Sequence, residues 1–572
     1  MTSEAAVEVR NLSFRYPGAA RDTLRNVSLR IERGDFVAVV GGNGSGKTTL
    51  CKTFNGLVPH YWSGEFAGEV RVGGIDTWHS SVAELSSTVG YVYQDFQNQL
   101  VRPTVRDEVA FGPINFGLAD HAERSAAALE GAGVTHLRDR FVWQLSGGQA
   151  HLTALASVLA MRPEIVVVDE PVAELDPAAA HEIYERLREL NTGGTTVIVI
   201  EHHAEFIAAY ASSVVLMSDG APVWHLPTRE ALGRAGDLVR HGIPAPQITE
   251  TVRRLRLDGV PRSVEEAAGL VTAALERHAL EPAPVPAPDT ATTGSQPREA
   301  VATVRGVGHG YRSVAGQVQP VLESLDLALH RGERIALIGG NGAGKSTLMR
   351  LLAGIQVPRQ GTIEVDGVDT HSMPAHKLVE HAAYLYQQPS RMFLTSSVRE
   401  DVALFPRNRG LPRAEELVEE ILGRVRLTDM ADRDGRTLSG GQQRRATLAI
   451  GLAMGPSLLL LDEPTASLDV ASRDDVIAML ADLSEVISCA MVATHDMHLV
   501  AEWATRVIAL EDGRVVADGT PREIFANPEA LRRARLIPPQ VVQLGAALGL
   551  DPLPLAVAEM VARFRARDRQ MA

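Results

Sequence analysis

A glycine-rich stretch that occurs twice restricts the possible folds of this chain more than any other feature. It reads GGNGSGKTT at residues 41–49 and GGNGAGKST at residues 339–347. Each copy follows a short apolar run, residues 36–40 or 335–338, which predicts a buried strand. Each copy also leads into a helix-compatible segment that ends at a glycine, a common cap of helix C-termini. A strand, a glycine-rich turn, a lysine with a hydroxyl residue and a helix form a phosphate-binding P-loop.

The residue types of this loop match the chemistry of a bound triphosphate. Glycines let backbone N–H groups point inward, and the helix N-terminus adds positive potential. Lys47 or Lys345 supplies a mobile charge for the β- and γ-phosphates, and Thr48 or Ser346 supplies a hydroxyl to Mg²⁺. The sequence therefore predicts two nucleotide sites, with loop residues Gly41, Asn43, Gly44, Ser45, Gly46, Lys47, Thr48 and Thr49 in one and Gly339, Asn341, Gly342, Ala343, Gly344, Lys345, Ser346 and Thr347 in the other.

Length, charge and cysteine content exclude several classes of protein. At 572 residues the chain is too long for one core. Its net charge of −14 disfavours a non-specific nucleic-acid binder, and Cys51 and Cys489 alone cannot form a thiolate metal site. We expect no signal peptide, and the longest apolar runs are strand-sized. The chain is therefore expected to be cytoplasmic or peripheral, with separate partners for any membrane role.

The chain contains an internal repeat. A constant offset of 293 residues relates Gln94 to Gln387, Ser146 to Ser439, Glu170 to Glu463 and His202 to His495. The P-loop lysines differ by 298, because the first half has five additional residues between Gly56 and Gly68. We assign no chemistry to this insert region, which includes His60, Tyr61 and Trp62. A surface loop that packs on itself is the simpler interpretation.

Composition divides the chain into residues 1–280, a linker at residues 281–299, and residues 300–572. Alternating proline in the linker favours an extended chain of about 3 Å per residue, so about twenty residues could span roughly 60 Å. Each half begins with strand-like alternation and then alternates strand and helix signals. This pattern predicts α/β domains with a mainly parallel sheet and antiparallel strands near the start. We expect helical tails at residues 238–278 and 528–567, each with a proline break.

Two apolar runs that end in paired carboxylates supply the second nucleotide motif. Residues 165–170 read IVVVDE and residues 458–463 read LLLLDE. A strand end would place Asp169 or Asp462 beside the P-loop, where it can hold Mg²⁺. The next residue, Glu170 or Glu463, can polarise an attacking water. One such pair alone could be a solvated turn, but its combination with a P-loop favours the nucleotide role.

A third motif, LSGGQ, occurs at residues 145–149 and 438–442, each time before a helical stretch. A serine and two glycines at a helix N-terminus make a second anion site. Each domain then has two surfaces that can bind phosphate, the P-loop and this turn. Both surfaces are used if two domains pair head to tail, so that the turn of each domain faces the P-loop of the other. The turn residues are Ser146, Gly147, Gly148 and Gln149 in the first half and Ser439, Gly440, Gly441 and Gln442 in the second.

With these motifs the chain resembles two ABC-type ATPase domains fused in tandem, and the resemblance covers nearly all of both halves. It implies ATP and Mg²⁺ as ligands, adenine stacking on Tyr16 and Tyr311, Q-loop glutamines Gln94 and Gln387 at Mg²⁺ and water, and switch histidines His202 and His495 at the γ-phosphate. As lone aromatics, the two tyrosines are equally compatible with core or edge positions.

The same resemblance implies a switch between two states. ATP binding would close the two halves, which pair within one chain, and hydrolysis would reopen them. One composite site would combine Lys47, Asp169, Glu170 and His202 with Ser439, and the other Lys345, Asp462, Glu463 and His495 with Ser146. Each site keeps its lysine, carboxylates and histidine, so we expect both to hydrolyse ATP.

The halves differ beside these motifs. After the signature, residues 443–445 read QRR, as is usual in the family, whereas residues 150–152 read AHL. The D-loop reads AELD at residues 173–176 and ASLD at residues 466–469, and Glu201 replaces the usual threonine before the switch histidine. Equal turnover at the two sites is therefore not expected.

Other tandem ABC proteins fit less well. Translation-type proteins usually have a long, charged helical linker and bind ribosomal RNA, whereas this linker is short and rich in proline and alanine, and the chain is acidic. Repair and ribosome-recycling relatives need zinc or iron–sulfur cysteines, which two cysteines cannot supply. Fused sugar importers commonly lack the second P-loop lysine, which is present here as Lys345. The ATPase of another ABC transporter, a sugar or peptide importer or an exporter, stays an alternative.

The stretch after the Q-loop favours one transporter group. Residues 104–117, TVRDEVAFGPINFG, and residues 97–100, QNQL, are similar to a pattern of energy-coupling factor ATPases, which serve vitamin, vitamin-precursor and transition-metal importers. Residues 392–405 keep the frame but lose the Gly-Pro. In that group this surface grips coupling helices of an integral-membrane scaffold subunit. The alternative is that this stretch is an ordinary amphipathic segment that packs on its own helical subdomain.

This second resemblance implies partners and a location. The partners would be the scaffold subunit and a membrane substrate-binding subunit, with no nucleic acid. The protein would lie at the cytoplasmic face of the cell membrane. Nothing in this sequence indicates which substrate is transported.

Overall fold

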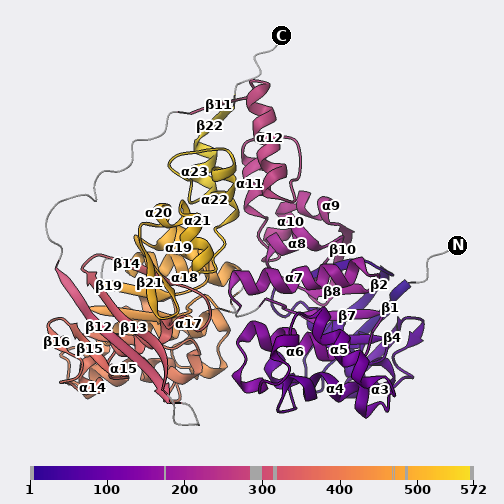
Figure 1. Cartoon of the computed structure of the whole chain (residues 1–572), viewed down its shortest axis with the longest axis horizontal. Helices are drawn as coiled ribbons and strands as arrows, with labels where there is room; N and C mark the ends of the chain where they lie inside the picture. Colours follow the sequence, from indigo (N-terminus) through magenta and orange to yellow (C-terminus); the bar gives the residue numbers. More distant parts are fainter. Residues whose placement is uncertain are drawn as a thin grey trace. The chain divides into compact units, whose positions relative to one another are not determined.

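The computed structural model describes residues 5–172, 175–283, 299–312, 318–466, 468, 470–483 and 487–566 (Figure 1). The described chain divides into two compact units. One runs to Glu281 and also takes in Ala566, and the other runs from Pro282 to Arg565. Most of the predicted linker, residues 284–298, lies outside the described residues.

The first unit is built on a six-stranded sheet with the order β10-β9-β3-β8-β7-β6. All neighbours in this sheet are parallel except β10 and β9. The central strands are runs of valine and isoleucine that are buried at every position, as expected for parallel strands covered on both faces. The strands are β3 (Phe36–Val40), β6 (Val89–Val92), β7 (Ile165–Asp169), β8 (Thr196–Ile200), β9 (Ser213–Ser218) and β10 (Ala221–Pro227).

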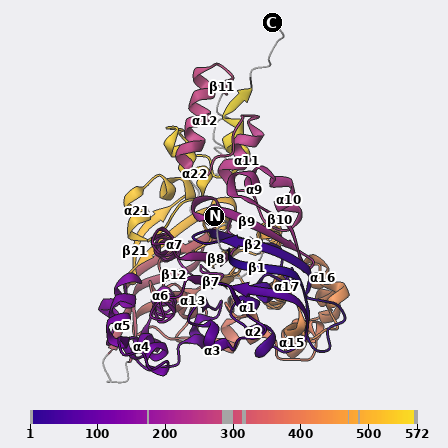
Figure 2. The same cartoon turned by 90° about the vertical axis from the view of Figure 1, so that its right-hand side faces the viewer.

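An antiparallel sheet with the order β2-β1-β4-β5 completes the β part of this unit. Its strands are β1 (Ala5–Arg15), β2 (Leu24–Glu32), β4 (Glu65–Val72) and β5 (Ile75–Asp76). Buried and exposed positions largely alternate along β2, because one face packs on the core and the other faces solvent. Strand β2 lies beside β10 of the first sheet (Figure 2).

Helices cover these sheets and form two further groups. Helices α4, α5 and α6 pack on one another as a helical subdomain after β6, and α9 to α12 form the tail. The helices are α1 (Lys47–Phe54), α2 (Leu57–His60), α3 (Val82–Leu85), α4 (Val105–Asn115), α5 (His121–Gly131), α6 (Gly147–Leu159), α7 (Pro177–Thr192), α8 (Ala204–Tyr210), α9 (Thr228–Gly233), α10 (Ala235–Arg240), α11 (Gln247–Arg254) and α12 (Val264–Glu276), followed by strand β11 (Leu280–Pro282).

The second unit repeats this architecture. Its mainly parallel sheet has the order β17-β18-β19-β14-β20-β21, and its antiparallel sheet the order β13-β12-β15-β16. The strands are β12 (Ala300–Arg312), β13 (Val318–His330), β14 (Arg334–Ile338), β15 (Gln360–Val365), β16 (Val368–Asp369), β17 (Ala382–Leu385), β18 (Leu458–Asp462), β19 (Cys489–Ala493), β20 (Arg506–Glu511), β21 (Arg514–Gly519) and β22 (Phe564–Ala566).

The helices of the second unit follow the same order. They are α13 (Lys345–Leu352), α14 (Ala375–Leu378), α15 (Val398–Asn408), α16 (Ala414–Arg424), α17 (Gly440–Ala453), α18 (Val470–Asp482), α19 (Met497–Trp503), α20 (Pro521–Phe525), α21 (Pro528–Arg533), α22 (Gln540–Ala547) and α23 (Val557–Ala562). The α/β class, the mainly parallel sheets and the helical subdomains that the sequence predicts are thus confirmed. Within the described ranges, no helix is long and apolar enough to cross a membrane.

The tails are helical with one departure. The predicted proline breaks separate helices, since Pro246 and Pro539 are the N-cap residues of α11 and α22. The second tail is mostly helical as predicted, but its last helix α23 ends at Ala562 and a short strand follows. The Arg563 N–H closes the last turn on the Met560 carbonyl oxygen at 3.2 Å. Its guanidinium donates a hydrogen bond to the Pro552 carbonyl oxygen.

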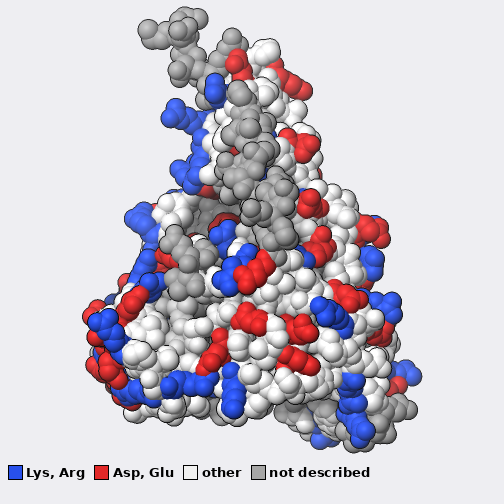
Figure 3. All heavy atoms as spheres, turned by 90° about the vertical axis from the view of Figure 1, so that its left-hand side faces the viewer, with Lys and Arg blue, Asp and Glu red and all other residues white. Residues whose placement is uncertain are grey.

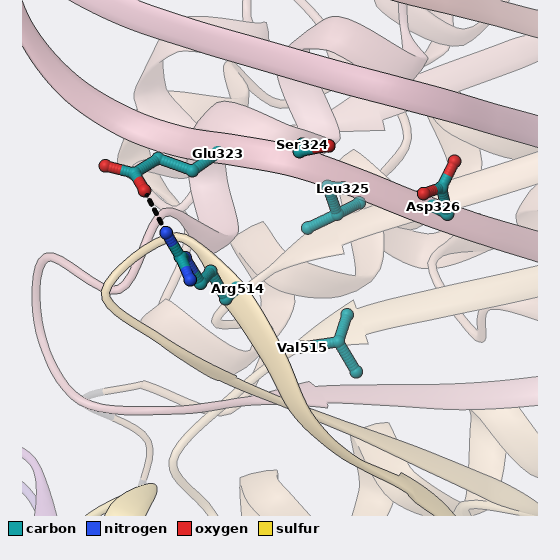
Figure 4. Close-up of a pocket in the computed structure, with 6 residues that line it drawn as sticks. All are labelled: Glu323, Ser324, Leu325, Asp326, Arg514 and Val515. Carbon is teal, nitrogen blue, oxygen red and sulfur yellow. Dashed lines mark hydrogen bonds and ion pairs between the residues drawn. The ribbon is translucent and has the colours of Figure 1, made fainter.

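The surface carries mixed charge, and a small pocket lies outside the predicted sites. Acidic and basic side chains are interspersed over the face drawn in Figure 3. The pocket, about 290 Å³, lies between β13 and β21, with an ion pair of Arg514 and Glu323 at 2.6 Å on one side and Asp326 on the other (Figure 4). None of the predicted nucleotide residues lines it.

The buried strand β18 gives a stability test of the second unit. Leu460 is fully buried two residues before Asp462. We expect Leu460→Ala to lower the free energy of unfolding by about 2–5 kcal/mol, because it removes buried methyl groups and leaves a cavity. Leu394→Ala is the control, since Leu394 is 71% exposed and should change stability by about 0.5 kcal/mol at most. Denaturant unfolding of the full chain measures both, and equal effects would contradict the burial of β18.

Candidate functional site

Each P-loop connects the end of a central strand to the start of a helix. In the first unit, Gly41 follows β3 with φ of 147°, and a Cβ there would lie 2.2 Å from the Met217 carbonyl oxygen. Gly339 has the same φ in the second unit, and its Cβ would lie 2.3 Å from the Leu510 carbonyl oxygen. Only glycine fits such a close approach of two backbones. Both loops therefore have the compact backbone that the sequence predicts.

The two P-loop lysines fold back over their own loops. Lys47 Nζ donates to the carbonyl oxygens of Gly41 and Gly42 at 2.8 and 3.0 Å. Lys345 Nζ makes the same pair of bonds to Gly339 and Gly340 at 2.6 and 3.2 Å. The ammonium groups thus lie at the mouth of each loop, where the sequence predicts the phosphates of a nucleotide.

The strand-end aspartates are brought to these loops. Asp169 is 4% exposed at the end of β7 and accepts hydrogen bonds from Tyr91 Oη at 3.1 Å and from the Thr48 hydroxyl. Burial raises the pKa of Asp169, although both hydrogen bonds and the nearby lysines oppose the rise. A carboxylate beside a hydroxyl is an oxygen donor set that suits Mg²⁺. The predicted metal ligands Thr48 and Asp169 therefore fit that ion.

Sequence reasoning missed the tyrosine that holds each aspartate. Tyr91 on β6 donates to Asp169 at 3.1 Å, and Tyr384 on β17 donates to Asp462 at 2.6 Å. Both tyrosines precede the Q-loop glutamine by three residues and obey the 293-residue offset. That shared position was a signal, but only the pairing of neighbouring strands shows where the hydroxyl groups point.

The glutamates after the aspartates adopt a left-handed backbone. Glu170 has φ of 51° and Glu463 has φ of 48°, a conformation that costs a residue with a Cβ roughly 1–2 kcal/mol. Their N–H groups anchor to the next strand, at the Ile200 carbonyl oxygen (3.1 Å) and the Ala493 carbonyl oxygen (2.9 Å). Strain of this kind concentrates at functional sites.

The glutamate partners differ between the units. In the first, Gln94 Nε2 donates to Glu170 Oε2 at 2.6 Å, which joins the predicted Q-loop glutamine to the predicted base. In the second, His495 Nδ1 lies 3.0 Å from Glu463 Oε1, and its backbone N–H donates to Oε2 at 3.4 Å. Gln387 is exposed at the corresponding end of β17.

The two switch histidines consequently have opposite electrostatics. Burial lowers the pKa of His495, but the Glu463 carboxylate outweighs this effect and the net pKa is raised. Burial and the neighbouring His203 lower the pKa of His202. Its nearest paired carboxylate is Glu201, with Oε1 3.9 Å from His202 Nδ1. Burial likewise raises the pKa of Glu170, whereas His495 and Lys345 keep that of Glu463 low despite burial.

The signature turns are exposed helix N-termini. Ser146 caps α6 and exchanges hydrogen bonds with Gln149, and Ser439 caps α17 and does the same with Gln442. In both turns the serine is solvent-exposed. The D-loop residues Ala173, Glu174, Ser467 and Asp469 lie outside the described residues.

The predicted adenine tyrosines lie beside the P-loop helices. Tyr16 Oη is 3.3 Å from Thr49 Oγ1, and Tyr311 Oη is 3.2 Å from Thr347 Oγ1. Tyr311 is 40% exposed and also donates to Gln356 at 2.9 Å. In the insert region, the rings of Tyr61 and Trp62 pack edge to face at 5.3 Å, and Lys52 lies over the Trp62 ring.

The Glu463–His495 pair makes a pH-dependent contribution to stability. The folded pKa of His495 is raised, so its contribution is complete below an unfolded pKa of about 6.5 and is lost as pH rises through the folded value. The folded pKa of Glu463 is lowered, so its share is lost only at acid pH. We expect His495→Gln to destabilise the nucleotide-free chain more at about pH 5.5 than at about pH 9.

His202→Gln is the matched control for this measurement. The pKa of His202 is lowered on folding, so protonation below about pH 6.5 destabilises the wild-type fold. The cost of His202→Gln should therefore shrink at about pH 5.5 relative to pH 9. The free energy of unfolding of both variants, measured at both pH values, tests this prediction. The same pH trend in both variants would contradict a stabilising Glu463–His495 pair.

Comparison with known proteins identifies the family. The sequence model of the family described as ABC transporter matches residues 24–173 and 322–466. A protein of Methanosarcina acetivorans named "Putative ABC transporter ATP-binding protein" is 33% identical over 99% of this chain and 92% of its own length. A protein of Methanosarcina mazei with the same name is 33% identical over 97% of this chain and 95% of its own length.

Two solved structures are also similar. One is cbiO1 from Clostridium perfringens, part of the ABC transporter complex cbiONQ, with 30% identity over 44% of this chain and 100% of that chain and a TM-score of 0.38. The other is an archaeal ribosome recycling factor, solved with the ribosomal stalk protein aP1, with 20% identity over 90% of each chain and a TM-score of 0.56. The second likeness concerns the fold alone. The chain belongs to the ABC transporter family, as an ATP-binding and ATP-hydrolysing member with two ATPase domains in one chain.

Proposed function

We propose that this chain is the fused ATPase pair of an energy-coupling factor importer, which takes up a vitamin, a vitamin precursor or a transition metal. It would act at the cytoplasmic face of the cell membrane with an integral-membrane scaffold subunit and a membrane substrate-binding subunit. Residues 1–280 and 300–572 are the two ATPase domains of this proposal, and residues 281–299 are their linker. The observation that carries it is a set of contacts that runs from the catalytic glutamate to an exposed apolar helix face.

The first part of this set links the Q-loop to helix α4. Gln94 holds Glu170 at 2.6 Å and is followed by the short 3₁₀ turn Phe96–Gln99. Glu108 of α4 is 3% exposed and accepts the N–H groups of Val101 and Arg102 at 2.8 and 2.6 Å. These hydrogen bonds join the start of α4 to the loop that leaves the predicted nucleotide site.

The second part is the exposed face of α4. Thr104 caps this helix, and Phe111, Ile114 and Phe116 at its C-terminal end are 39%, 55% and 44% exposed. Arg102 lies over the Phe111 ring at 5.4 Å. Exposed apolar side chains that cluster on one element mark an interaction surface. A coupling helix of a membrane subunit that sits here could sense whether Gln94 contacts Glu170.

The second unit keeps the same connection with different chemistry. Asp401 of α15 is 3% exposed and accepts the N–H groups of Leu394 and Thr395 at 2.9 and 2.8 Å. The residues that correspond to Ile114 and Phe116 are Arg407 and Arg409. The energy-coupling factor assignment therefore rests mainly on the surface of the first unit.

Within this proposal ATP is hydrolysed at two composite sites. The P-loop lysine and helix N-terminus bind the phosphates. Thr48 with Asp169, or Ser346 with Asp462, would hold Mg²⁺, which would supply positive charge for the phosphates. Glu170 or Glu463 polarises the attacking water. Ser439 would complete the first site and Ser146 the second. Binding of ATP then favours the closed pair, and hydrolysis releases it.

Single substitutions of the two glutamates test the shared catalysis. We expect Glu170→Gln and Glu463→Gln each to lower steady-state ATP hydrolysis while ATP binding is retained. The double variant should lose at least about 100-fold, because loss of a general base typically costs 10²–10⁴-fold. Glu123→Gln is the control, since the Glu123 side chain is 77% exposed. If either single variant hydrolyses ATP like the wild type, that site is not catalytic.

Affinity purification from detergent-solubilised membranes tests the partners. We expect the tagged full chain to recover integral-membrane subunits, and Phe111→Arg to lower that recovery at least about fivefold because it places a charge in an apolar contact. Val223→Arg is the matched control, because Val223 on β10 is 47% exposed but lies on another element. Recovery of ribosomes, or of a permease that works with a periplasmic binding protein, would overturn the assignment.

A further inference from the structure

The residue before the first switch histidine is a fully buried acid. Glu201 follows β8 and is 1% exposed, whereas Thr494 occupies the corresponding position after β19 in the second unit. A buried carboxylate is costly unless donors surround it. The contacts of Glu201 therefore indicate what it does.

Three donors converge on this carboxylate. Tyr184 of α7 donates from Oη to Glu201 Oε2 at 2.6 Å. The backbone N–H groups of His202 and His203 both donate to Oε1 at 2.8 Å. These two residues connect β8 to α8, whose N-cap residue His203 offers no side-chain cap of its own. Glu201 thus holds the whole segment that carries the switch histidine.

Tyr184 is itself fixed in the core. It is 1% exposed and stacks on Phe206 at 4.5 Å and on Tyr210 at 5.0 Å between ring centroids. Its hydroxyl cannot follow Glu201 if the acid moves, so the position of the carboxylate is determined from α7.

The second unit holds its switch segment by other residues. Thr494 Oγ1 accepts the Asp496 N–H at 3.0 Å, and Asp496 Oδ1 caps α19 by accepting the N–H groups of His498 and Leu499 at 3.0 and 3.2 Å. Asp496 is half-buried, and the positive charge of Arg473 from α18 lowers the pKa of its carboxyl against the effect of burial.

The residues that form these two arrangements occupy corresponding positions in the two units. Glu201, His203, Tyr184 and Ala180 in the first unit correspond to Thr494, Asp496, Ile477 and Arg473 in the second. In the first unit the preceding helix supplies the hydrogen-bond donor Tyr184 to the acid that holds the segment, and in the second it supplies Arg473, whose positive charge favours the ionised acid. The acid and the helix residue that stabilises it differ together between the units, which indicates that the two arrangements have the same role.

A hydrogen bond between the Glu201 carboxylate and the His202 imidazole is excluded by distance. Glu201 Oε1 is 3.9 Å from His202 Nδ1, which is too long for a hydrogen bond. The side chains of Glu201, His202 and His203 bring possible metal-ligand atoms within 4.8 Å of one another. Both oxygens of Glu201 already accept hydrogen bonds, however, so the geometry favours a role in holding the backbone of His202 and His203 over a role in binding a metal.

We propose that Glu201, fixed by Tyr184, is the positioning residue of the first ATP site: it holds the backbone of His202 and His203 and thereby places the switch histidine for hydrolysis. The proposal rests on the proposed hydrolysis of ATP at this site. Placement of a group next to the reacting phosphate affects the rate of the chemical step more than the binding of substrate. Loss of Glu201 should therefore lower kcat with little change in KM.

Kinetics of the full chain test this role. Glu463→Gln serves as the background, so that the remaining turnover reports the first site. There we expect Glu201→Ala to lower kcat at least about tenfold with KM for ATP within about threefold. Glu201→Gln should stay within about threefold of the background kcat, because its amide oxygen still accepts both backbone N–H groups. The double variant Glu201→Thr with His203→Asp, which imports two of the four residues of the second unit, should regain part of the loss.

Hydrogen exchange of backbone amides provides a second readout that does not need turnover. We expect faster exchange of the His202 and His203 amides in Glu201→Ala but not in Glu201→Gln, with α7 and β8 unchanged as a check of folding. Unchanged exchange in Glu201→Ala, an unchanged kcat, or a rise in KM alone would each overturn the positioning role. Absence of turnover in the Glu463→Gln background would instead contradict hydrolysis at the first site, and the exchange measurement would still decide the role of Glu201.

Discussion

Parallel pairing of four buried strands is the interaction on which the rest of each unit depends. In the first unit β3, β8, β7 and β6 are neighbours, and all four run in the same direction. The carboxyl ends of parallel strands lie at one edge of a sheet, where ligands of α/β proteins bind. The P-loop, the switch histidine, the Asp-Glu pair and the Q-loop follow these four ends in turn. Burial of the apolar strand residues thus assembles the nucleotide site.

The same sheet supports two different charge arrangements. In the second unit Glu463, the predicted catalytic glutamate, pairs with His495, the predicted switch histidine, at 3.0 Å. In the first unit the glutamate is held by Gln94, and the histidine segment is held by Glu201. Because a buried charge must be satisfied locally, an acid at the position just after β8 requires a donor on α7. The asymmetry of the two sites therefore extends beyond the motifs into the surrounding core.

Short-range features were predictable because they depend on local sequence. Strand β3 has the predicted bounds, and Gly56 and Gly354 follow the P-loop helices with positive φ, as a helix C-cap requires. The second tail is mostly helical as predicted, but the short strand that begins at Phe564 was not predicted, because a strand of three residues leaves no recognisable alternation in the sequence. The roles of Tyr91 and Tyr384 were missed because a strand residue gives no sign of which neighbouring strand its hydroxyl will meet.

By itself the sequence determined the family, and it predicted two nucleotide sites and the residues that carry their chemistry, since P-loop, Asp-Glu and LSGGQ motifs are contiguous and their function follows from local backbone form. Tertiary structure alone decided which partner each of these residues has. Tyr91 meets Asp169 across 78 positions and Gln94 meets Glu170 across 76. Such contacts arise only when strand order and helix packing bring distant segments together, and that order is set by burial of the whole core and not by any one motif.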